Sequence, residues 1–136
     1  MTDLDHVACA PELLDDWIDF EPHPNFLFRI AEKEVDAWIL ADMTGVSTLF
    51  GVSMKGLPID TQTIQDPKQT IINLARRSRK RKIKDIVPVG TASQGPGYNL
   101  VLTEFVLNDW DPGLAAKHNM SLHKAIHRIK EFLTDV

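Results

Sequence analysis

The stretch NFLFRIAEKEVDAWILAD, residues 25–42, decides how the rest of the chain is interpreted. It begins with a short apolar run, residues 26–30, whose length and aromatic content are typical of a buried strand. The second half changes period, because Val35 and Trp38 lie at helical spacing among good helix formers. The sequence therefore predicts a strand over residues 26–30 and a helix over residues 35–42.

Three acidic residues, Glu32, Glu34 and Asp36, gather where this strand gives way to the helix. The carboxyl end of a strand beside a helix start is where α/β proteins often bind metal ions or phosphate groups. The alternative is that acids in a first helical turn only complement the helix dipole, each stabilising the helix by roughly 0.3–1 kcal/mol. From this stretch alone, both interpretations stay open.

Helical patterns dominate the remainder of the chain. An acid followed by proline marks two helix starts, Asp66–Pro67 and Asp111–Pro112. Residues 53–65 are expected to form an irregular loop, since glycine, proline and polar residues alternate there. We expect helices over residues 11–19, 44–50, 98–110, 112–116 and 121–133, and a helix from residue 67 that is followed by further turns ending before Pro88.

The closing helix is expected to begin at Ser121, which is a favourable N-cap residue. Its apolar positions, including Ile129 and Leu133, recur at helical spacing and predict a buried stripe. Trp17 lies on the apolar stripe of the first predicted helix and is expected in the core.

The composition is that of an ordinary globular protein, with 136 residues of which 43% are hydrophobic and 25% charged. The single cysteine, Cys9, excludes an internal disulfide and offers no thiolate cluster for zinc. No apolar run approaches the roughly 20 residues of a membrane-spanning helix, and the first residues lack the features of a signal peptide. We therefore expect a cytoplasmic protein with no membrane partner.

The net charge of −4 conceals a strongly basic run at residues 76–84. Seven of the fifteen basic residues lie there: Arg76, Arg77, Arg79, Lys80, Arg81, Lys82 and Lys84. The rest of the chain holds 15 − 7 = 8 basic residues against 19 acids, a balance of −11. The run predicts salt-dependent, sequence-independent contact with the phosphates of DNA or RNA. Two alternatives stay open: pairing with the chain's own acids, and a solvated helix end whose cations complement the dipole.

Two weaker candidates are a loop and a pair of histidines. The loop at residues 90–98 is rich in glycine and could surround a phosphate, but it lacks the lysine and the spacing of a P-loop and is otherwise a connector. His123 and His127 are four residues apart on the last helix, a spacing that can chelate a metal or simply belong to a solvated face.

Five segments taken together resemble an uncharacterised bacterial family related to TOPRIM domains, some members of which are associated with phage defence and restriction. The segments are TDLD at 2–5, HPNFLFRIA at 23–31, EVDAWILAD at 34–42, DPKQTIINLARRS at 66–78 and GPGYN at 95–99. The resemblance covers nearly the whole chain and is to the C-terminal part of that family. It implies a mainly α (α+β) fold in a single domain, with a truncated TOPRIM-like α/β part over residues 1–42 and a helical part over residues 43–136.

The resemblance also implies a magnesium site. The aspartate pair of the TOPRIM pattern falls on Asp3 and Asp5, and the acids after the next strand match Glu34 and Asp36. Carboxylates at strand ends suit Mg²⁺, which prefers oxygen ligands, and a bound Mg²⁺ can polarise a phosphodiester and position water.

The glutamate strand of TOPRIM domains lies upstream of the aspartate pair, and this sequence departs from the pattern because nothing precedes Met1 in it. The residues given are therefore not expected to complete a catalytic site alone. Three hypotheses follow: a Mg²⁺-dependent phosphodiester-acting protein completed by upstream residues or another chain, a non-catalytic nucleic-acid-binding or assembly module, and an interaction domain that forms a homodimer through an open sheet edge.

Overall fold

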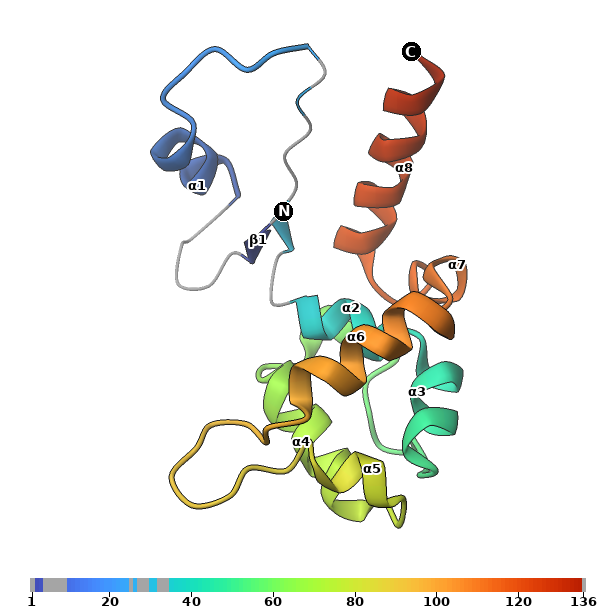
Figure 1. Ribbon diagram of the computed structural model, residues 1–136. Coiled ribbons are helices and arrows are strands. Elements are labelled where there is room, and N and C mark those ends of the chain that lie inside the picture. The colour runs from blue at the N-terminus through green and yellow to red at the C-terminus, as the bar shows by residue number, and fades with distance from the viewer. Residues whose placement is uncertain (1, 4–9, 25, 27–29, 32–34, 136) are drawn as a thin grey trace.

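Helices make up most of the structure. The computed structural model describes residues 2–3, 10–24, 26, 30–31 and 35–135. Within these residues lie α1 (Ala10–Trp17), α2 (Val35–Ala41), α3 (Met43–Phe50), the 3₁₀ helix η1 (Thr61–Thr63), α4 (Pro67–Arg77), α5 (Arg81–Lys84), α6 (Tyr98–Asn108), α7 (Pro112–Ala115) and α8 (Met120–Thr134) (Figure 1). The prediction of a mainly helical chain is confirmed. Among the described helices, none combines the length and the apolar character needed to cross a lipid bilayer.

Two short strands, β1 (Thr2–Asp3) and β2 (Ile30–Ala31), pair in parallel. Parallel strands need a long crossover connection, and the segment between these two contains α1. The described residues therefore hold two strands of two residues each, in an otherwise helical molecule.

The strand predicted over residues 26–30 is confirmed only at its end, Ile30. The Phe26 N–H donates to the His23 carbonyl across 2.8 Å, so Phe26 belongs to a turn and not to a strand ladder. Pro24 takes the second position of that turn, where its fixed φ angle is favoured. Residues 27–29 lie outside the described residues.

Helix α2 joins the two parts of the hydrophobic core. All five of its residues from 37 to 41 are buried. Ile39 and Leu40 belong to a larger cluster built with α3 to α6, whereas Trp38 and Ala41 pack with residues of α7 and α8. A helix that is apolar on several sides is a buried one, and α2 therefore fixes the position of both clusters.

Helix boundaries follow local chemistry. The Asp66 carboxylate accepts a hydrogen bond from the Gln69 N–H at 2.8 Å, which confirms the predicted start of α4. Gly51 ends α3 with φ of 64°, a left-handed conformation that favours glycine. Residues 53–65, expected to be irregular, include the single turn of η1 capped by Asp60.

Asn119, and not Ser121, caps α8. Its side-chain oxygen accepts from the Leu122 N–H at 3.1 Å and from the Ser121 hydroxyl at 3.0 Å. Ser121 Oγ in turn accepts from the Trp38 indole N–H at 2.7 Å, and Asn119 Nδ2 donates to Thr61 Oγ1 at 3.0 Å. The prediction of Ser121 as the cap is wrong because Asn119 begins the helix two residues earlier and uses Ser121 inside a buried polar network.

The outer turns of α8 are not buried. Ile129 is 43% exposed and Leu133 is 67% exposed, whereas Phe132 is half-buried, so the prediction of a continuous buried stripe is wrong at Ile129 and Leu133. The helix rises past α6 and α7, which lie at its first turns, and it also contacts β2 (Figure 1). Trp17, expected in the core, is 57% exposed on α1. The chain therefore leaves apolar side chains in solvent at this end of the molecule.

Candidate nucleic-acid interface

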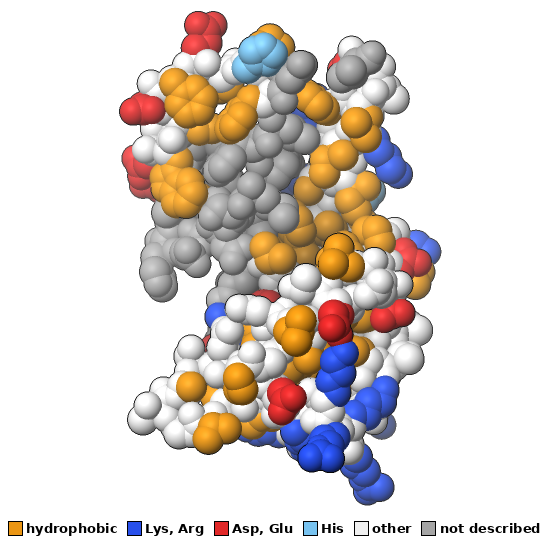
Figure 2. Space-filling model, viewed as in Figure 1, with side chains coloured by type: hydrophobic (Ala, Val, Ile, Leu, Met, Phe, Trp, Pro, Cys, Tyr) orange, Lys and Arg blue, Asp and Glu red, His pale blue; other side chains and the backbone are white. Residues whose placement is uncertain are grey.

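The basic run, residues 76–84, occupies the end of α4, a short turn and the whole of α5. All seven of its cationic residues are exposed. Figure 2 shows lysine and arginine side chains gathered at this end of the molecule, where Figure 1 places α4 and α5. The run is thus a single cationic surface and not a set of scattered charges.

Buried residues hold this surface in place. Ile83 and Ile86 lie in the larger hydrophobic cluster and anchor α5 from below. Ser78, in the turn, is also buried: its hydroxyl donates to the Phe50 carbonyl at 2.6 Å and accepts from the Lys80 N–H at 3.1 Å. The charged side chains therefore project from a well-packed base, which lowers the entropic cost of binding through them.

Several of the cations are positioned by backbone carbonyls. Lys80 Nζ donates to the Thr48 carbonyl at 2.6 Å, and Lys84 Nζ donates to the Arg76 carbonyl at 2.7 Å. The Arg77 guanidinium donates to the Ser53 carbonyl at 3.1 Å. A carbonyl acceptor orients a cation but leaves its net charge in place, so these contacts arrange the positive surface without neutralising it.

Few acids oppose the run. In the described part of the chain, one ion pair involves it, between Lys82 and Glu104 of α6, with both side chains largely exposed. Arg79 and Arg81 have no hydrogen-bond or ion-pair partner there. In this part of the structure, pairing with the chain's own acids therefore neutralises one of the seven cations of the basic run.

The fold adds a cation that the sequence pattern did not include. The segment at Ser53 contacts the basic run through Arg77, and Lys55 lies two residues further along, exposed. Lys55 is far from residues 76–84 in sequence, so charge clustering along the chain could not find it. The signal is the hydrogen bond between Arg77 and the Ser53 carbonyl, which brings the segment that carries Lys55 to the basic run.

The glycine-rich loop at residues 90–98 is hydrogen-bonded to the backbone directly after α5. The Gly95 N–H donates to the Ile86 carbonyl and the Gly97 N–H donates to the Asp85 carbonyl, each at 2.9 Å. A Cβ atom on Gly95 would lie 2.1 Å from the Asp85 carbonyl oxygen, so glycine is needed for this close approach. These two N–H groups are used inside the protein, which favours the connector interpretation over phosphate binding by them.

The predicted magnesium site falls largely outside the described residues. Asp5 and Glu34 lie outside them, and of Asp3 only the backbone is described, opposite Ala31 in the parallel pair. Asp36 is half-buried in the first turn of α2. The parallel register directs the carboxyl ends of both strands to one edge, but the described side chains supply one of four carboxylates, so the fit to Mg²⁺ stays a prediction.

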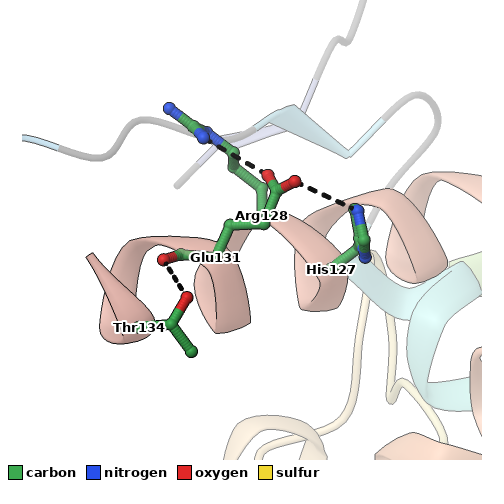
Figure 3. Close-up of polar contacts among 4 residues, drawn as sticks. All are labelled: His127, Arg128, Glu131 and Thr134. Atoms are coloured by element: carbon green, nitrogen blue, oxygen red, sulfur yellow. Dashed lines mark hydrogen bonds and ion pairs between the residues drawn. The ribbon is translucent and has the colours of Figure 1, made fainter.

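No group of three or more histidine, cysteine, aspartate or glutamate side chains that could hold a metal is found among the described side chains. His127 Nε2 lies 3.3 Å from a Glu131 carboxylate oxygen, and Arg128 Nη1 lies 3.3 Å from the other oxygen of that carboxylate (Figure 3). Both histidines of the predicted pair are exposed on α8. This arrangement favours a solvated helix face for His123 and His127.

Comparison with known proteins gives no relative: no family model, no curated protein and no solved structure matches this chain. The functional argument therefore rests on the geometry of the chain itself.

Proposed function

We propose that this protein binds nucleic acid through its phosphate backbone, using the basic run at residues 76–84 with Lys55 beside it. The observation that carries the proposal is that seven exposed cations share one packed surface and, in the described part of the chain, one carboxylate pairs with them. Mutual repulsion among such charges is relieved when a polyanion replaces their counterions.

The type of recognition follows from what surrounds the run. The most exposed aromatic side chains of the described residues, Trp17, Phe20 and Phe26, belong to the N-terminal segment, at the other end of the molecule (Figure 1). Without aromatic platforms beside the cations, stacking on single-stranded bases has no support. Contact with the backbone of a duplex, independent of sequence, fits the surface better.

The TOPRIM resemblance agrees with this ligand class, because TOPRIM domains act on nucleic acids. A magnesium site built from Asp3, Asp5, Glu34 and Asp36 would add metal-dependent contact with a phosphate, and we keep it as a separate part of the proposal. Binding by the basic run does not depend on it, and Mg²⁺ added during a titration distinguishes the two.

The test is a fluorescence-anisotropy titration of a labelled duplex, repeated over a range of salt concentrations. A duplex of about 12 base pairs is short enough that one or two protein chains can bind to it. We expect log Kd to rise linearly with log salt, because bound cations release counterions. The variant Arg79→Ala/Arg81→Ala/Lys82→Ala should bind roughly tenfold to a hundredfold more weakly at low salt and have a flatter slope.

The matched control is Lys117→Ala/Lys124→Ala/Lys130→Ala, which removes the same charge from α8 and from the turn before it. Its affinity and salt slope should stay near those of the original chain. Equal losses in both triple variants would mean that net charge, and not the basic run, governs binding, and wild-type behaviour of the first variant would remove the run from the interface.

A further inference from the structure

At the end of the molecule away from the basic run, α7 and α8 line two grooves that meet at Pro112 and Ile126. The first groove has a volume of about 440 Å³, and its walls are apolar and include Trp38, Trp110 and Ile129. Together with the exposed outer turns of α8, it forms an apolar surface larger than the isolated apolar side chains that are normal on a soluble protein.

The second groove, of about 770 Å³, combines apolar and cationic side chains. Met120, which is 56% exposed, and Ile126 line it together with Lys117, His123 and Lys130. We call the surface formed by these two grooves and the outer turns of α8 the α7–α8 face. Its chemistry fits a partner that presents apolar side chains flanked by carboxylates.

The cations of this face are available for such a partner. In the described part of the structure, Lys117 and Lys130, which line the second groove, have no carboxylate within ion-pair distance. Glu131, the acid on the same stretch of α8, is already engaged by His127 and Arg128 (Figure 3). These lysines therefore have no ion-pair partner among the described side chains beside the apolar grooves.

The chain itself carries a surface of the complementary kind. Residues 10–24, which we call the acidic segment, contain five acids and no lysine or arginine. Within this segment Trp17 and Phe20 are both more than half exposed. Figure 2 shows acidic and hydrophobic side chains side by side around α1.

We propose that two copies of this chain associate reciprocally, with the acidic segment of each copy on the α7–α8 face of the other. Both surfaces lie at the same end of the molecule (Figure 1), so one two-fold axis can bring both pairs together in a closed dimer. Apolar burial supplies affinity, and the opposite charges set the register and direction of the pairing.

A membrane surface is a poorer match for the same face. Anionic lipids would attract the lysines of α8, but the five acids of the neighbouring segment lie at the same end of the molecule and would be repelled. A second copy, in contrast, uses both sets of charges. The basic runs lie at the far ends of such a dimer, which leaves them free for a polyanion.

Sedimentation velocity of the full chain from about 1 to about 200 µM tests the dimer. We expect the mean mass to rise from the 15.3 kDa of one chain toward twice that value. The variant Ile129→Lys/Leu133→Lys should stay monomeric over this range, because it places charge in the apolar contact. Both positions are already exposed, so its circular dichroism and urea midpoint should match those of the original chain.

Charge reversal gives a second, independent readout. Lys117→Glu/Lys130→Glu should weaken the dimer at least tenfold, and adding Asp15→Lys/Asp16→Lys to the same chain should restore it, since the attraction is recreated with opposite sign. Substitutions in the acidic segment could not rescue a misfolded α8, so restored dimerisation of the quadruple variant would indicate direct contact between the two surfaces.

Two outcomes would overturn the proposal. The first is a chain that stays monomeric at every concentration, including the case in which it then sediments with anionic phosphatidylserine vesicles, which would assign the face to a membrane. The second is a dimer that survives both sets of substitutions, which would place the contact elsewhere. Neither result bears on nucleic-acid binding, because the short-duplex titration reads the basic run in monomers and dimers alike.

Discussion

The two ends of this molecule both carry lysine and arginine, yet their surroundings differ. At the basic run, the cations project from buried Ile83, Ile86 and Ser78, and the apolar side chains lie beneath them. On the α7–α8 face, apolar Met120 and Ile129 share the surface with the cations. Cations alone fit a polyanion, whereas cations beside exposed apolar side chains fit an acidic, amphipathic protein surface.

The largest expected effect comes from removing the support beneath the basic run. In Gly95→Ala, the new Cβ atom would meet the Asp85 carbonyl oxygen at 2.1 Å and the Ile86 carbonyl carbon at 2.5 Å, both in the backbone. We expect a loss of about 3 kcal/mol in the free energy of unfolding, measured by urea denaturation. Duplex binding should weaken as well, because α5 must move to relieve the collision.

Gly90→Ala is the control in the same loop. Its Cβ atom would meet nothing within 4 Å, although φ is +63°. The expected cost is about 1 kcal/mol for the left-handed backbone, with duplex binding unchanged. If both substitutions cost the same, the close approach of Gly95 to residues 85–87, directly after α5, does not stabilise the basic run.

The second effect concerns the base of α8. Asn119→Ala removes the helix cap and leaves the buried hydroxyls of Ser121 and Thr61 each without one hydrogen-bond partner. We expect a loss of about 2–3 kcal/mol, since a cap and buried polar partners are lost together. The exposed cap Asp66 makes the comparison: Asp66→Ala should cost about 1 kcal/mol by the same urea measurement. If Asn119→Ala lowers the free energy of unfolding no more than Asp66→Ala does, the buried hydrogen-bond network around Asn119 does not stabilise the fold.

The starts of α4 and α8 also show which features of the fold can be predicted from the sequence. The start of α4 follows from Asp66 and Pro67 alone, because a cap and a proline act within one turn. The start of α8 does not, since Asn119 and Ser121 are both favourable caps and the choice depends on Trp38 and Thr61, which are distant in sequence. Local chemistry was predictable, and long-range hydrogen bonding was not.

The candidate surfaces divide in the same way. The basic run was visible in the sequence, but its exposure, its support by Ser78 and its contact with the Lys55 segment depend on the tertiary fold. The apolar stripe of α8 was also visible, and was predicted to be buried. Periodicity shows which residues share a helix face but not whether another element covers it, so Leu133 could not be placed from sequence.

The smallest expected effect comes from removing a single carboxylate beside the basic run. Glu104→Gln removes the carboxylate that pairs with Lys82 while keeping the shape of the side chain. Stability should change by less than about 0.5 kcal/mol, because both partners are largely exposed. Duplex affinity should rise about twofold to threefold at low salt, since Lys82 is freed and a repelling charge is lost, and this gain should fade as salt screens the surface.

Glu131→Gln makes the same change of net charge on α8, where the carboxylate pairs with His127 and Arg128. If the basic run alone meets the duplex, this second substitution should leave short-duplex affinity unchanged, because α8 and the basic run lie at opposite ends of the molecule (Figure 1) and salt screens the interaction between distant charges. Dimerisation should respond in the reverse way, strengthening with Glu131→Gln and staying constant with Glu104→Gln. Equal responses of duplex binding to both substitutions would mean that the duplex senses the summed charge of the protein, and the distinction between its two ends would then fail.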